Sequence, residues 1–331
     1  MLIRFSELDF YSLLDADTDE ARTFTTYLGY WVSLAEHVQD RYGDDPSTAL
    51  LAEMQGRRAF LRLSGQGKPS DPAGVRSLLL NGWTSELRLH LIDLEDAQRL
   101  SVANHGAPVD AYYASSRHAT AWLTVRDSNA PATHRGLLNA MSAQVANSRL
   151  LPPPWDLTCS AVRPALVYGG FPGPPGESSN LAAAADPHSR AAMLLRTTRR
   201  RGVEKKVGEV KHRLKRRRAP NGEAERQDRS LPPTTIFDFA WRMRARSNYG
   251  DPAMYYVGSL GPQRAQAYAA AIRTWTNATM FVFEALIAQR ARDVVEDAAV
   301  HFVSRDHSGI AATLIVPRLR ALGLLSAVGG P

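Results

Sequence analysis

The sequence predicts an all-α or nearly all-α protein, in which two helical bundles are joined by a basic linker. Apolar side chains recur at helical spacing in both halves of the chain, most clearly over residues 24–38 and 263–301. Stretches rich in proline and glycine, together with a dense run of cations, separate these regions. The expected helical domains are therefore residues 1–168 and 232–331, with residues 169–231 as a flexible, Pro/Gly-flanked linker.

Composition narrows the class of protein further. The chain has 331 residues, 44% of them hydrophobic, which suffices for roughly two domains with real cores. The single cysteine, Cys159, excludes an internal disulfide and a multi-cysteine zinc site. Residues 1–10 lack the apolar region of a signal peptide, and no stretch approaches the ~20 apolar residues of a membrane span. We therefore expect a cytoplasmic protein without a transmembrane segment.

Capping residues mark the starts of the N-terminal helices. Thr18 precedes two acids and opens a helix that Gly43 ends. Asp-Pro pairs at 45–46 and 71–72 start two more helices, because proline suits the first helical position. Residues 87–91 alternate leucine with Arg and His, which fits either a short strand or a helix. Further helices are expected at 109–125, 133–146, 263–301 and 310–325.

The basic segment is residues 196–218. Its formal charge is +10, which leaves −3 for the rest of the chain. An apolar stripe from Val203 to Leu214 predicts a helix otherwise covered by cations, suited to nucleic-acid phosphates through counterion release. The alternatives are an anionic membrane surface, for which the stripe lacks an aromatic anchor, and a solvated linker. The predicted nucleic-acid contacts here are Arg199, Arg200, Arg201, Lys205, Lys206, Lys211, Arg213, Lys215, Arg216, Arg217 and Arg218.

A second pattern runs from Asp110 to Leu123 and from His134 to Leu138. Paired tyrosines among small residues, a polar turn and a helix that starts His-x-Gly-Leu-Leu follow one another. This pattern, within about residues 105–155, resembles the HEPN superfamily of helical bundles. The resemblance implies an RNA-directed protein, since many members are metal-independent ribonucleases of toxin–antitoxin and phage-defence systems and others only bind RNA.

The resemblance also implies how RNA would be cleaved. An arginine and a histidine on one helix face, doubled by homodimerisation, can activate a ribose 2′-hydroxyl and stabilise charge on the phosphate. His134 is the candidate base. The family signature has a shorter Arg–His spacing than the seven residues between Arg126 and His134. The alternative interpretation of His134 is a polar residue at a helix start.

The third pattern follows the aromatic residues 237–241. Arg242 and Arg246 would share one helix face at a separation of four residues. Dense polar groups beside aromatic rings suit the binding of a phosphate or a stacked base. The alternative is a capped turn whose arginines pair with nearby acids. Arg246 is the second catalytic candidate, and the remaining predicted contacts are Arg242, Arg244, Asn248 and Tyr249.

No metal or cofactor is expected. The spacing of His301, Asp306 and His307 matches no standard metal site, and no phosphate loop or dinucleotide motif is present. Glu284 stands in an apolar helix, so its carboxylate requires a partner, for which we expect an arginine.

Two functional hypotheses follow. The first is a HEPN-like, RNA-directed protein, with metal-independent ribonuclease activity in a toxin or defence system. The second is a non-catalytic interaction module that its basic linker tethers to nucleic acid, which the departure from the Arg–His spacing favours.

Overall fold

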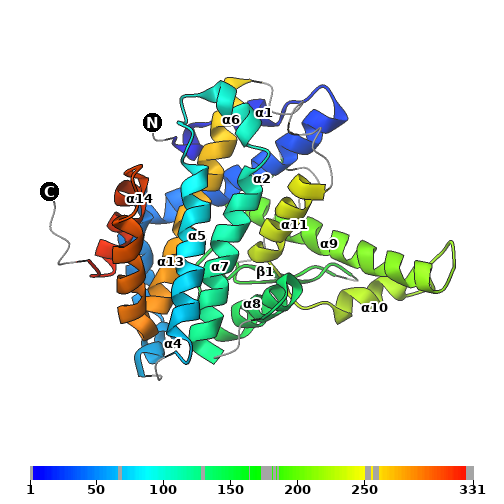
Figure 1. Ribbon diagram of the computed structural model, residues 1–331. Coiled ribbons are helices and arrows are strands. Elements are labelled where there is room, and N and C mark those ends of the chain that lie inside the picture. The colour runs from blue at the N-terminus through cyan, green and yellow to red at the C-terminus, as the bar shows by residue number, and fades with distance from the viewer. Residues whose placement is uncertain are drawn as a thin grey trace.

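Helices dominate the fold, as the sequence predicts. The strands among the described residues form one small sheet of three strands (Figure 1). None of the described helices is long and apolar enough to cross a membrane. The computed structural model describes residues 3–65, 69–127, 131–163, 165–172, 181, 184, 186–249, 255 and 261–325.

The long helix α13 (Pro262–Val303) forms the axis of the molecule (Figure 1). It packs against α2 (Asp19–Tyr42), α5 (Pro72–Leu89) and α7 (Ala107–Asp127). Its sequence between Ile272 and Ile287 is almost entirely buried because helices cover it on several sides. Residues 87–89 belong to α5, so the first part of the ambiguous leucine stretch is helical.

The predicted helix starts are confirmed by their caps. The hydroxyl of Thr18 accepts a hydrogen bond from the Ala21 amide at 3.1 Å. Asp45 and Asp71 cap α3 (Pro46–Gln55) and α5 through their carboxylates. These bonds satisfy amides that lack a partner within the helix.

The remaining helices complete the body. Thr133 caps α8 one residue before His134. Their bounds are η1 (Phe5–Glu7), α1 (Phe10–Leu14), α4 (Arg58–Leu61), η2 (Arg62–Gly65), α6 (Ala97–Ala103), α8 (His134–Ser148), α11 (Ile236–Tyr249) and α14 (Ile310–Ala321).

The two predicted helical domains share one hydrophobic core. A continuous buried cluster runs from Phe5 to Leu325 and includes α2, α5, α7 and α13. Trp155, from the first half of the chain, stacks on Trp275 of α13 at a centroid distance of 5.1 Å. Its indole Nε1 donates to Thr279 Oγ1 at 2.9 Å. The division at residues 168 and 232 is therefore not found in the packing.

A small antiparallel sheet joins segments on both sides of the predicted linker. Its order is β2 (Val167–Gly169), β1 (Thr158–Ala161), β3 (Thr234–Thr235). Cys159 pairs with Tyr168 on one side and with Thr234 on the other. The sequence analysis did not predict these strands, since runs of two to four residues carry too little alternation.

The predicted flexible linker contains two helices. Asp186 caps α9 (Pro187–Arg213), whose first turns are buried against α2. After the turn at 214–222, α10 (Glu223–Ser230) packs back along α9. The outer part of this α9–α10 hairpin projects from the side of the bundle (Figure 1). A helix, and not a flexible tether, thus presents the basic segment.

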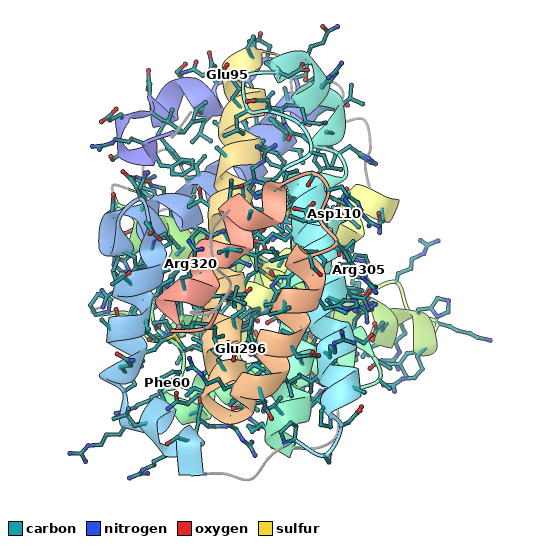
Figure 2. The ribbon with its side chains drawn as sticks, turned by 60° about the vertical axis from the view of Figure 1, so that its left-hand side comes forward. Phe60, Glu95, Asp110, Glu296, Arg305 and Arg320 are labelled. Carbon is teal, nitrogen blue, oxygen red and sulfur yellow. The ribbon has the colours of Figure 1, made fainter. Side chains whose placement is uncertain are left out.

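The predicted arginine partner of Glu284 is Arg318, on α14. The fully buried guanidinium bonds Glu284 at 2.7 and 3.0 Å and Glu86 of α5 at 2.5 and 2.8 Å. Trp83 Nε1 also donates to Glu284, at 2.7 Å. This buried ion network fixes α14 to α5 and α13, whereas Arg320 of the same helix is exposed (Figure 2).

Candidate nucleic-acid interface

The outer part of α9 and the turn after it present most of the predicted cations to solvent. Lys206 and Lys211 are half-buried, and Lys206 bonds Glu209 at 2.8 Å. Among the described residues, this is the only ion pair that the cations of 200–218 form. The exposed members are Arg200, Arg201, Lys205, Arg213, Lys215, Arg216, Arg217 and Arg218.

Arg199 is the exception, because it is an interior residue. Its guanidinium is buried and bonds the Asp228 carboxylate at 2.6 Å and the Pro232 carbonyl at 2.8 Å. Asp228 also accepts the amides of Val162 and Arg163, each at 2.8 Å. Arg199 therefore holds α10 and the sheet against α9, and its predicted role in binding nucleic acid is wrong.

The helical phase of α9 explains the burial of Arg199. Val203, the first residue of the predicted apolar stripe, lies four residues after Arg199 and is buried on the same face. Leu214, at the end of the stripe, is 44% exposed. Extending the stripe backward by one turn could have identified Arg199 as an inward-facing residue.

A groove follows the same part of α9. It has a volume of about 290 Å³ and lies between α9, α10 and the segment after β1. Arg163, Arg200 and Lys211 line it together with Val203 and Val207. Cations above an apolar floor suit a sugar–phosphate strand, whose charge and carbon atoms both find partners there.

A second set of residues gathers at the start of α8, and we name it the His134 cluster. The His134 ring stacks on Trp241 of α11, with a centroid distance of 4.9 Å and an interplanar angle of 28°. Its Nδ1 lies 2.8 Å from the Tyr112 hydroxyl. The cluster consists of Tyr112, Tyr113 and Arg117 of α7, His134 of α8, and Trp241 and Arg244 of α11.

Arg244 lies among the rings of this cluster. Its guanidinium carbon is 4.7 Å from the Trp241 centroid and 5.3 Å from that of Tyr113. One of its nitrogens donates to the Tyr113 hydroxyl at 2.8 Å. Arg117, which is exposed, lies 6.0 Å from the same tyrosine ring. Two cations thus flank partly exposed aromatic rings, an arrangement that cation–π attraction stabilises.

The electrostatics keep His134 neutral near pH 7. Partial burial lowers the pKa of the imidazole, and the charges of Arg244 and Arg117 lower it further. Burial also raises the pKa of Tyr112, so its hydroxyl keeps its proton. A neutral imidazole has one nitrogen that can accept a proton, which a general base requires.

Arg242 and Arg246 lie on the other side of α11, as their spacing predicts. The Arg242 guanidinium donates to the Tyr27 hydroxyl at 3.0 Å and to Thr198 at 3.2 Å, so it links α11 to α2 and α9. Arg246 lies 5.6 Å from the Tyr27 ring. The contacts of His134 lie on α7 and α11 and include neither Tyr27 nor Arg246.

The arginine that His134 meets is therefore Arg244, and not Arg246. The three-residue step from Trp241 to Arg244 was the available signal, since it places both on the α11 face opposite Arg246. Asn248 is exposed near the end of α11, and the Tyr249 side chain lies outside the described part of the chain.

The His134 cluster and the basic helix lie within electrostatic reach of each other. The hydrogen bond from Lys206 is the main cause that lowers the pKa of Glu209 on α9, and Arg135 of α8 adds to it. Arg201 of α9 likewise lowers the pKa of Arg242, which burial lowers first. Elements α8, α9, α10 and α11 occupy one side of the bundle (Figure 1).

Within the described ranges, no three His, Cys, Asp or Glu side chains come together as a metal site. Asp306, a metal candidate by composition, instead caps α14 by accepting the Ala311 amide at 2.6 Å. Comparison with protein-family models, curated proteins and solved structures finds no match to this chain.

Proposed function

We propose that this protein binds RNA in the cytoplasm, with α9 contacting the phosphates and the His134 cluster receiving an unpaired base. The observation that carries the proposal is the row of exposed cations on the projecting hairpin. Buried arginines of the protein have protein partners, as Arg199 does, whereas Arg200, Arg201 and Lys205 have no ionic partner among the described residues. Such a row is free to replace the counterions of a polyanion.

The geometry favours single-stranded RNA as the polyanion. From residue 200 to residue 213 the helix spans about 20 Å, which is long enough for several successive phosphates. The aromatic rings at α8 and α11 offer π-faces to bases that have left a helix. A HEPN-like fold and a homodimer remain part of this proposal, on the resemblance of residues 105–155.

A gel-shift titration tests binding. Replacing Arg200, Arg201 and Lys205 with glutamine should weaken RNA binding and lower the salt dependence of log K by about 2, since three phosphate contacts are lost. The control removes the same charge elsewhere, at the exposed Arg58, Arg62 and Arg320. Equal losses in both variants would reduce the effect to net charge and contradict a defined interface.

Metal-independent cleavage of RNA is a second candidate function. A neutral His134 lies beside the cations Arg244 and Arg117, a combination that could take a proton from the 2′-hydroxyl and stabilise phosphate charge. In the presence of a chelator, His134→Ala should abolish cleavage on a denaturing gel while leaving the native gel shift in place.

Two further variants locate the reaction. Arg117→Ala should slow cleavage, because it removes an exposed cation beside the histidine. Arg246→Ala should leave cleavage unchanged, since Arg246 lies on the Tyr27 side of α11. Binding without cleavage in the unaltered protein would support a non-catalytic interaction module.

A further inference from the structure

A polar pocket lies where the N-terminal segment, the ends of α2 and α5, and α13 meet. Its volume is about 280 Å³. His90, Arg273, Thr274 and Asn277 supply its polar lining, and Leu94 supplies part of its apolar wall. None of these residues belongs to the basic hairpin or to the His134 cluster.

Arg273 is half-buried in this pocket without an ionic partner. One nitrogen donates to the Ile92 carbonyl at 2.5 Å, and the buried Nε has no hydrogen-bond partner. Among the described residues it forms no ion pair, although the charge of Asp93 acts on it from a distance. Burial lowers its pKa to about 10, so the charged guanidinium is poorly compensated.

His90 adds a second unsatisfied group. It follows the last residue of α5, and its Nε2 is buried without a hydrogen-bond partner. Burial lowers its pKa to about 3, with further contributions from Arg273 and Arg318. The ring is therefore neutral at pH 7 and carries one N–H that it can donate.

Other groups in the pocket are arranged to fit the same ligand. Thr274 and Asn277 follow Arg273 on the same stretch of α13, so a hydroxyl and an amide accompany the guanidinium. Gln39 takes no part, because its amide already bonds Ile3, Phe5 and Asp44. Asp44, at the rim, has Arg4 at 3.7 Å, which offsets its negative charge.

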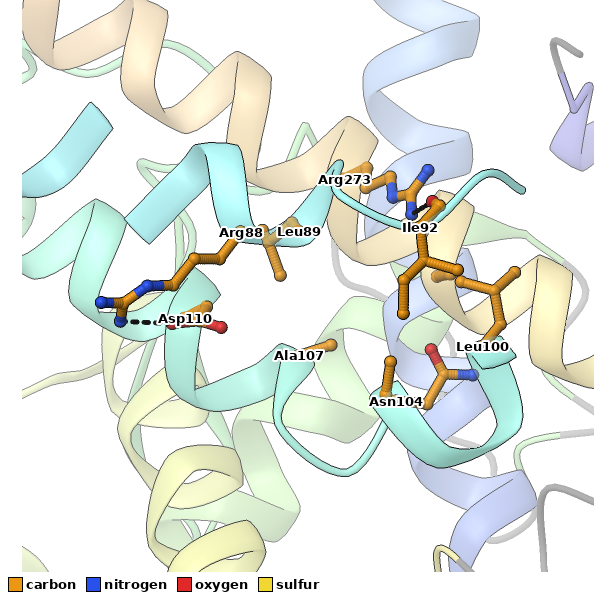
Figure 3. Close-up of a pocket in the computed structure, with 10 residues that line it drawn as sticks. Arg88, Leu89, Ile92, Leu100, Asn104, Ala107, Asp110 and Arg273 are labelled. Atoms are coloured by element: carbon orange, nitrogen blue, oxygen red, sulfur yellow. Dashed lines mark hydrogen bonds and ion pairs between the residues drawn. The ribbon is translucent and has the colours of Figure 1, made fainter. Parts of the chain in front are cut away.

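A cavity on the other side of residues 89–92 gives a useful contrast. It has a volume of about 110 Å³ and also includes Arg273 (Figure 3). Its polar groups bond one another or the backbone. Arg88 pairs with Asp110 at 3.5 Å, and Asn104 donates to the Ala265 carbonyl at 3.0 Å. The first cavity is satisfied from within, whereas the pocket of His90 is not.

We propose that the pocket binds the oxyanion of a small molecule, a phosphate or a carboxylate, between the Arg273 guanidinium and the His90 imidazole. Arg273 provides the opposite charge, and His90 Nε2–H, Thr274 and Asn277 provide hydrogen bonds. The wall of Leu94 and Ala270 accepts the apolar part of the ligand. This site is independent of the proposed RNA function, since it shares no residue with it.

Isothermal titration of the full chain with sodium phosphate, pyrophosphate and succinate tests the proposal, and the three salts distinguish phosphate from carboxylate. Saturable binding of at least one is expected. Arg273→Met should raise its dissociation constant about tenfold or more, because a charge-assisted contact is lost. Arg273→Lys should retain part of the affinity, since it keeps the charge but not the fork of donors.

Matched variants and an independent readout exclude trivial causes. Arg88→Met, in the neighbouring cavity, and Arg216→Gln with Arg217→Gln, on the hairpin, should leave the dissociation constant unchanged. The His90 ring resonance should shift on titration in the wild type and not in Arg273→Met, with far-UV dichroism confirming that the variant folds. Absence of saturable binding, or equal affinity in Arg273→Met, would overturn the proposal.

Discussion

At the scale of single residues, identical side chains have opposite roles. Arg199 and Arg200 are neighbours on α9, yet the first is buried against Asp228 and the second is exposed over the groove. Sequence composition treats them alike, because a run of cations gives no information on which members face inward. Only the helical phase relative to Val203 separates them.

The pair therefore makes a matched experiment. Arg199→Met should lower the free energy of unfolding by about 3–5 kcal/mol, because it leaves Asp228 buried without its cation. Arg200→Met should change stability by less than about 0.5 kcal/mol, as expected for an exposed residue, and weaken RNA binding. Urea titrations and gel shifts of the two proteins would reveal an exchange of these effects, which would refute the assignment.

Buried histidine is a second feature of this scale. His37 is 4% exposed, and its ring lies edge-on to His188 at 4.4 Å. Burial lowers its pKa to about 3 from 6.5, with the charges of His188 and Arg41 contributing less. The folded protein thus lacks a proton that the unfolded chain binds, so the stabilisation is complete above pH 6.5 and is lost as pH falls from 6.5 toward 3.

His37→Phe keeps a ring at this position and removes its titration. The stability of the wild type relative to the variant should fall by about 1.4 kcal/mol for each pH unit below 6.5. Taking the difference cancels groups common to both proteins, such as Asp238, whose pKa burial raises to about 6. Urea unfolding at pH 7.5, 6.0 and 5.0 measures it, and a pH-independent difference would contradict a neutral His37.

At the scale of elements, the sequence predicts helices well where caps are explicit and poorly where partners decide. The Asp-Pro rule that identified α3 and α5 also applies at Asp186-Pro187, where α9 begins. The sequence analysis missed that start because the flanking residues are rich in glycine, serine and alanine. The strands of the small sheet had no such signal, since their pairing partners lie far apart in the chain.

The element whose position depends most on one residue is α14. Arg318→Met should lower the free energy of unfolding by about 3–5 kcal/mol, because Glu86 and Glu284 lose their shared cation. Hydrogen exchange should accelerate first in α14. Arg320→Met, on the exposed face of the same helix, serves as the control and should change neither quantity. Undiminished protection of α14 in Arg318→Met would mean that apolar packing alone holds it.

At the scale of the whole molecule, helical periodicity predicted apolar faces but not which faces meet. The prediction of two domains rested on length and on the proline- and glycine-rich stretch near residue 170. Amphipathic patterns do not specify a partner, so the union of α2, α5 and α7 around α13 was not predictable from them. The buried carboxylate of Glu284 did predict its arginine, because an unpaired charge in a core is too costly.

A single core has a consequence that truncation can test. Residues 1–168 expressed separately should fail to fold, because α2, α5 and α7 lose the helix against which they pack. The full chain should unfold in one transition, with tryptophan fluorescence and far-UV dichroism coinciding. A fragment with dispersed amide resonances and its own cooperative melt would restore the two-domain interpretation.

The position of α13 in the chain also bears on how the protein is made. During synthesis α2, α5 and α7 leave the ribosome well before residues 262–303 have been polymerised. At about 5–20 residues per second, the interval between the end of α2 and the end of α13 lasts roughly 10 to 50 seconds. Throughout that time the apolar faces of the early helices lack their native partner and are open to aggregation or to chaperones. The helix at the centre of the finished fold thus makes nascent-chain protection a requirement of its production.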